Sequence, residues 1–143
     1  MVERISEHYQ LLDHTADLRI RVTGADPADL FKNAGLALFD VIARTGRLEP
    51  QAVIEVNVNG ADRADLMVNF LRELLYLWTG KQQWVNTIDI LKISETAVFA
   101  RVSTVFRQPD RHRIRHEIKA VTYHQIDVSQ TNAGWLTTVV FDV

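Results

Sequence analysis

The sequence contains no cysteine, which excludes disulfides and thiolate metal sites and is compatible with a reducing compartment. It also lacks a long hydrophobic run, because no stretch approaches the ~18 apolar residues that a membrane span requires. Residues 1–7 do not contain the apolar core of a signal peptide. The net charge of -2 is small, so no overall field attracts nucleic acid or an anionic membrane. We therefore expect a cytoplasmic protein that does not associate with membranes.

The common signatures of a catalytic site are also missing. The sequence has no phosphate-cradling glycine loop, no G-x-S-x-G or H-E-x-x-H motif, and no cysteine nucleophile. We therefore expect no self-contained active site, and a protein that is not itself an enzyme.

Hydrophobic periodicity in the 143 residues predicts one α+β domain over residues 1–143. Helical spacing of apolar residues predicts two helices, from Pro27 to just before Gly46 and from about Asp62 or Asp65 to Thr79, the second being the more buried. Because the predicted strands come mostly as hairpins, we expect a mainly antiparallel sheet with the two helices packed on it. No internal repeat is apparent. Alternating apolar residues predict strands over residues 17–23, 52–59, 84–93, 97–106, 116–128 and 135–142.

A short polar cluster and the last residues of the chain form the strongest candidate site. His14 and Asp17 directly precede or open the first predicted strand, and Asp142 lies in the last one, followed by Val143. If the last strand is central, the two ends meet, and two aspartates and an α-carboxylate form an oxygen-rich site. Such a site suits a hard divalent cation, namely calcium, magnesium or manganese. By spacing alone, ordinary strand-end aspartates that cap turns explain the pattern more often.

Lys119 is a candidate for a functional positive charge near these carboxylates. A hairpin that turns near Asn132 would place Asp142 opposite roughly Val121, within about one residue pair of Lys119. A lysine held beside carboxylates keeps its charge, and it would steady the anionic cluster or contact a phosphate or a partner's acid. A solvated lysine at a sheet edge is the alternative.

Three further polar residues are weaker candidates. His14 and His124 would serve as metal ligands or acid–base groups, or else as hydrogen-bonded structural histidines. Asp40 lies within the apolar stripe of the first predicted helix, and it is either a third carboxylate of the site or a solvated flank.

Residues 107–115 form a polar loop rich in arginine, and this loop is the basis of an alternative function. Its arginines would hold RNA phosphates, in which case the protein is an RNA-binding module or chaperone. The loop has no interleaved aromatic residues for base stacking, and it would equally dock an acidic protein surface or stay solvated. A stand-alone hydrolase that uses Asp17, Asp142 and a metal is a further alternative, although no nucleophile or base beyond the carboxylates is apparent. The arginines of the loop are Arg107, Arg111, Arg113 and Arg115.

Five segments, in order over nearly the whole chain, resemble the archease family. The most specific are His14-Thr15-Ala16-Asp17 and the Lys-Ala-x-Thr-Tyr pattern that begins at Lys119. The length of the chain is also similar to that of the family. The other matches are residues 36–40 in the first predicted helix, residues 70–77 in the second, and the closing Phe141-Asp142-Val143.

The resemblance implies a protein cofactor of RtcB-type RNA ligases. These ligases join RNA ends that bear a 2′,3′-cyclic phosphate or a 3′-phosphate to a 5′-hydroxyl, as in tRNA splicing and RNA repair. Archease-like proteins promote guanylylation of the ligase by GTP and help it to turn over repeatedly. They are not thought to perform the ligation themselves, so this protein would meet RNA through the ligase.

The resemblance also implies a set of site residues. The divalent-cation site of the family, often seen with calcium, would map onto Asp17, Asp142 and the terminal Val143. The cation would be either functional or a structural tie between the chain ends. Lys119 and His14 would serve function or contact with the partner.

Other positions match the family without a role or depart from it. Asp40 and His124 match family motifs, but the resemblance assigns them no function. Asn69 and Arg72 stand where an aspartate and an asparagine are expected in many relatives. The loop of residues 107–115 is also richer in arginine than expected. These departures would alter the docking surface rather than the proposed metal site.

Overall fold

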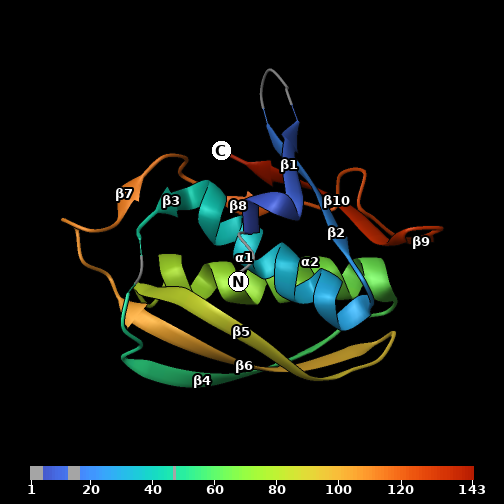
Figure 1. Ribbon diagram of the computed structural model, residues 1–143, viewed down its shortest axis with the longest axis horizontal. Helices are drawn as coiled ribbons and strands as arrows, with labels where there is room; N and C mark the ends of the chain where they lie inside the picture. Colours follow the sequence, from blue (N-terminus) through green and yellow to red (C-terminus); the bar gives the residue numbers. More distant parts are fainter. Residues whose placement is uncertain (1–4, 13–16, 47) are drawn as a thin grey trace.

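Two α-helices lie between two antiparallel sheets in the part of the chain that the computed structural model describes, residues 5–12, 17–46 and 48–143 (Figure 1). Buried apolar side chains from both sheets and both helices form one hydrophobic cluster. The predicted α+β class, mainly antiparallel with two helices packed on the sheet, is confirmed. His14 lies outside the described residues.

The first sheet has five strands and joins segments from opposite ends of the chain. Its edge strand at residues 9–12 is not predicted by the sequence pattern, because these four residues are too few to show a clear alternation. The strand order is β1 (Tyr9–Leu12), β2 (Leu18–Gly24), β10 (Gly134–Asp142) and β8 (Ala120–Val121), and β9 (Asp127–Thr131) also pairs with β10.

Strands β2 and β10 are at the centre of the first sheet. Their antiparallel register runs from Leu18 opposite Phe141 to Gly24 opposite Trp135. Alternate residues of β2 are buried, as the sequence pattern predicts, and Ile20 and Phe141 are fully buried against the helices. The pairing holds the end of the chain beside its first long strand.

Helices α1 (Pro27–Ile42) and α2 (Arg63–Thr79) confirm the two predicted helices, and each contacts both sheets. Ten of the 16 residues of α1 are buried, against nine of the 17 of α2, so the prediction that the second helix is the more buried is wrong. Helix α1 ends at Ile42, earlier than the predicted end just before Gly46, because Ala43 adopts an extended conformation. Neither helix, in the described residues, is long and apolar enough to cross a membrane.

The second sheet covers the opposite side of the helices, and all three of its strands match predicted strands. A separate pair of short strands links the end of α1 to the arginine-rich loop. The second sheet has the order β4 (Ala52–Asn59), β6 (Ala97–Phe106) and β5 (Gln83–Ile93), and the short pair is β3 (Ala43–Arg44) with β7 (Arg113–Ile114).

A short repeat connects a strand to each helix. Residues 24–30 read GADPADL and residues 60–66 read GADRADL. In both copies the first aspartate accepts a hydrogen bond from the N–H of the second at 2.8 Å, and the second accepts one from the alanine after the glycine at 2.8 Å. A Cβ on Gly24 or Gly60 would lie 2.4 or 2.5 Å from the backbone nitrogen of the leucine that ends the copy. The expectation of no internal repeat is therefore wrong.

The strand predicted over residues 116–128 is interrupted. Only Ala120–Val121 of its first part pairs with β10, and β9 begins at Asp127. Between them the chain turns, with Gln125 at a φ of 53° and the N–H of Ile126 donating to the carbonyl oxygen of Tyr123 at 3.2 Å. The left-handed backbone at Gln125 ends the extended conformation, which the alternating pattern of side chains did not reveal.

Candidate functional site

The two aspartates of the sequence-predicted metal site lie at the same end of the central strand pair. Leu18 and Phe141 are the last pair in the register of β2 and β10. Asp17 directly precedes Leu18, and Asp142 directly follows Phe141. Asp142 is exposed and Asp17 is half-buried, so solvent or a partner reaches this end of the sheet. We call Asp17, Asp142 and Val143 the acidic end.

Lys119 lies next to the acidic end along the neighbouring strand. Asp142 pairs with Ala120, rather than with Val121 as predicted, so the register differs by one residue. The N–H of Lys119 donates to the carbonyl oxygen of Asp142 at 2.8 Å. The side chain of Lys119 is exposed and lines a groove beside α2. Its backbone is therefore tied to the acidic end, whereas the residue stays exposed beside α2.

The acidic end has two side-chain carboxylates, and the predicted cation site would need a further donor. No three His, Asp or Glu side chains gather in the ranges 5–12, 17–46 and 48–143. The donors that the family resemblance implies would be the carboxylates of Asp17 and Asp142, together with the α-carboxylate of Val143. Carboxylate oxygens are the ligands that calcium, magnesium and manganese prefer. His124 is exposed in the turn after β8 and is not one of these donors.

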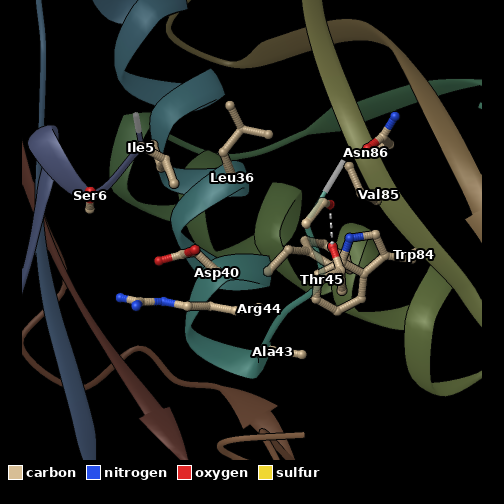
Figure 2. A pocket seen from close by; sticks show the side chains of 12 residues that line it. Ile5, Ser6, Leu36, Asp40, Ala43, Arg44, Thr45, Trp84, Val85 and Asn86 are labelled. Atoms are coloured by element: carbon tan, nitrogen blue, oxygen red, sulfur yellow. Dashed lines mark hydrogen bonds between the residues drawn. The ribbon is translucent and has the colours of Figure 1, made fainter. Parts of the chain in front are cut away.

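Asp40 accepts a hydrogen bond from Tyr9, a partner that the sequence analysis does not predict. The hydroxyl of Tyr9 donates to the Oδ2 atom of Asp40 at 2.5 Å and so ties β1 to α1. Burial, with the hydrogen bond to Asp40, raises the pKa of Tyr9 above its usual range. Asp40 and Arg44 point to the same side of a groove of about 620 Å³, beside Ser6 (Figure 2). Tyr9 is 31 positions from Asp40, so no local sequence signal reveals this pair.

A clamp formed by α2 and the segment after β8 supports the position of Lys119. The Nε of Arg72 donates to the carbonyl oxygen of Val121 at 3.0 Å, and its guanidinium carbon lies 4.6 Å from the centre of the Tyr123 ring. The hydroxyl of Tyr123 donates to Asp65 at 2.7 Å and to Asn69 at 3.2 Å. The hydrogen bond from the backbone N–H of Ala61, followed by that from the Tyr123 hydroxyl, lowers the pKa of Asp65. Both departures of α2 from the family pattern therefore contact Tyr123, which sequence separation conceals.

The arginine-rich loop is less polar than the sequence predicts. His112 is only 3% exposed, and its ring lies 5.3 Å from that of Trp78 and 5.1 Å from that of Trp84. Its Nδ1 accepts a hydrogen bond from the N–H of Gln108 at 2.8 Å, and burial lowers the pKa of His112. Arg107 lies over the ring of Trp78 at 5.0 Å. The loop is therefore anchored to the core by its one histidine, and the remaining arginines of the loop are exposed.

The fold is an α+β domain in which the first and last strands belong to one sheet. Asp17 and Asp142 lie at one end of its central strand pair. The model of the Archease protein family (MTH1598/TM1083) matches residues 9–143, and the chain belongs to this family. Its relatives include Protein archease of Methanosarcina acetivorans, 34% identical over 139 residues that cover 94% of this chain and 95% of the relative. Protein archease of Pyrococcus abyssi is 33% identical over 142 residues, with 96% and 97% covered.

Solved structures share the fold. The solution structure of Methanobacterium thermoautotrophicum protein 1598 has a TM-score of 0.78 and 24% identity, and the match covers 96% of this chain and 99% of that one. The crystal structure of an archease from Thermotoga maritima, described as a possible chaperone, has a TM-score of 0.62 and 21% identity, with 94% and 96% covered. At these identities the likeness concerns the fold alone.

Proposed function

We propose that the protein is an accessory factor that activates an RtcB-type RNA ligase in tRNA splicing or RNA repair. It promotes the GTP-dependent guanylylation of the ligase and its multiple turnover, and it does not catalyse ligation itself. Membership of the archease family supports this proposal. The observation that carries it is the meeting of Asp17 and Asp142 at one end of β2 and β10, with Lys119 hydrogen-bonded beside them.

Asp17, Asp142 and the α-carboxylate of Val143 would hold a divalent cation, with calcium as the first candidate and magnesium or manganese as alternatives. When bound, the ion supplies positive charge that positions a triphosphate or stabilises charge developing in nucleotidyl transfer. Asp142 is the last residue of β10, whereas Asp17 directly precedes β2 and Val143 directly follows β10, so all three donors would stand at one end of the paired central strands.

The residues around the acidic end present it to a partner. Phe141 is fully buried directly before Asp142, so the core holds the base of the acidic end while Asp142 itself stays exposed. The N–H of Lys119 fixes the carbonyl oxygen of Asp142. The exposed ammonium of Lys119 is then free to contact a phosphate or an acidic side chain of the ligase, close to the carboxylates.

Guanylylation of the cognate ligase without any RNA tests the proposal. The ligase is incubated with labelled GTP and a divalent metal, and covalent GMP on the ligase is followed with and without this protein. We expect faster guanylylation in its presence. Asp89→Ala, which removes an exposed aspartate from β5 in the other sheet, serves as the matched control and should stimulate normally. Equal rates with and without the protein would contradict the proposal.

A further inference from the structure

We propose that the exposed side of α2, with the neighbouring β8 segment, binds single-stranded nucleic acid. We call this surface the α2 face and define it by Arg72, Tyr76, Lys81, Lys119 and Tyr123, all of which are exposed. It is separate from the arginine-rich loop, and it does not depend on the proposed activation of a ligase. Helix α2 and strand β8 are in contact, and residues of both line one groove.

A groove runs through the middle of the α2 face. It has a volume of about 340 Å³, and Arg72, Tyr76 and Lys119 are among the residues that line it. Cations therefore stand on both walls, since Arg72 belongs to α2 and Lys119 to the segment before β8. A groove with positive charge on both sides tracks a phosphate backbone.

Tyr76 is an exposed aromatic residue among those that line the groove. It is 52% exposed. A Cβ on Gly80 would lie 2.2 Å from a ring carbon of Tyr76, so the ring rests directly against the backbone of that glycine. The Nζ of Lys81 lies 5.9 Å from the ring centre. A planar ring that is exposed and already positioned stacks a base at little entropic cost.

Tyr123 and Arg72 form a second flat element of the α2 face. Tyr123 is 46% exposed, and its hydroxyl is held by Asp65 at 2.7 Å. The guanidinium of Arg72 lies over the Tyr123 ring, and its Nε is fixed by the carbonyl oxygen of Val121. A guanidinium plane fixed in this way offers its outer face to a base and its remaining N–H groups to a phosphate.

The α2 face carries more cations than acids. Arg72, Lys81 and Lys119 have no acid within 4.0 Å among the residues that the structure describes. Glu73 is an exposed acid on the same helix, and Asp65 interacts electrostatically with Arg72, so three cations stand against two acids. An acidic protein surface would satisfy the charges but not the aromatic platforms. A single strand supplies both phosphates and unpaired bases, and we therefore assign this ligand class.

Fluorescence anisotropy of a labelled oligouridine of about 12 nucleotides, within the range of known single-strand site sizes, tests the assignment. The full-length protein is titrated at low salt and then at increasing salt, against the same length of RNA duplex. The double variant Arg72→Gln/Tyr76→Leu removes one cation and one platform. Tyr76→Leu alone leaves the bond from Arg72 to Val121 intact and serves as a second variant. Arg101→Gln in β6 is the matched control, and Arg111, Arg113 and Arg115 changed together to Gln test the loop.

We expect the single strand to bind more tightly than the duplex. The double variant should bind about tenfold or more weakly, since stacking on one aromatic ring is worth about 1–3 kcal/mol per base. Loss of one phosphate contact should reduce the salt slope by about 0.7. The Arg101→Gln control and the loop variant should bind nearly as well as the unmodified protein.

Three results would overturn the assignment. The first is no binding of the oligonucleotide at low salt. The second is weaker binding by the loop variant but not by the folded α2 variants. The third is equal competition by polyglutamate, which would indicate an acidic protein as the ligand. The guanylylation assay contains no RNA, so failure here leaves the proposed function separately testable.

Discussion

The N–H of Lys119 donates to the carbonyl oxygen of Asp142 at 2.8 Å. This single bond joins the segment that carries the candidate partner-contact lysine to the strand that carries the candidate cation ligand. Because Phe141, directly before Asp142, is fully buried, the bond is set on a rigid base. A change at either residue should therefore be felt through local geometry at the acidic end rather than through loss of the fold.

Asp17→Ala should remove the response to calcium while leaving the apo protein folded. Ligand at about 100 times its dissociation constant stabilises a protein by about 2.7 kcal/mol. For a protein of this length, that stabilisation raises the melting temperature by roughly 5–10 °C. We expect such a rise with calcium in the unmodified protein and none in Asp17→Ala, measured by thermal unfolding monitored with circular dichroism. A large fall in melting temperature without calcium would instead assign Asp17 a structural role.

Gly60→Ala should destabilise the protein by about 1–3 kcal/mol, the typical cost of overpacking. The added Cβ would lie 2.5 Å from the backbone nitrogen of Leu66, which cannot swing aside as a side-chain tip does. Gly24→Ala at the equivalent repeat position should cost a similar amount, and urea unfolding measures both. Ala61→Ser, at an exposed neighbour, should change stability by less than about 0.5 kcal/mol. Unchanged stability in both glycine variants would contradict the close approach of strand end and helix.

Stability should fall as the pH drops through the range in which histidine becomes protonated, and His112 should contribute to that fall. Burial lowers the pKa of His112 in the folded state, so the unfolded chain binds the proton more readily. The stabilisation is thus fully present above the unfolded pKa of about 6.5, and it is lost as the pH falls toward the folded value. Urea unfolding at about pH 7.5 and about pH 5 should show a smaller pH effect in His112→Phe. Parallel profiles for the two proteins would exclude this role.

Asp40→Ala should weaken the fold and spare the function. The change leaves the half-buried hydroxyl of Tyr9 without its acceptor, at a cost of about 1–3 kcal/mol. At a temperature where the variant is folded, ligase guanylylation should be stimulated normally, because Asp40 is bonded to Tyr9 and not placed with the acidic end. If stimulation were lost from a folded variant, Asp40 would belong to the functional site.

The sequence predicts those parts of the fold whose signals are local. Strand β4 and both helices follow from alternation, helical spacing and aspartate caps within single segments. The interruption after β8 is not predictable, because the positive φ of Gln125 has no distinctive residue type to mark it. The burial of His112 is also hidden, since its cage forms from Trp78 and Trp84 in other elements.

The candidate site shows the same division. The placement of Asp142 beside Lys119 follows within one residue from counting back around a hairpin. The pair of Tyr9 with Asp40 and the clamp of Arg72 on Tyr123 depend on tertiary contacts between distant segments. Sequence patterns are local and do not show which distant residues come into contact. They therefore identify these residues without their partners.

The most direct test of the acidic end is the rate of ligase guanylylation with Asp142→Ala. The assay uses GTP and a divalent metal without RNA, and it compares the variant with the unmodified protein and with the Asp89→Ala control. Asp142 is exposed, so its removal should leave the melting temperature nearly unchanged. We predict that the unmodified protein and the control accelerate guanylylation, whereas Asp142→Ala does not. Full stimulation by a folded Asp142→Ala protein would contradict the account, because the acidic end would then not be the part that acts on the ligase.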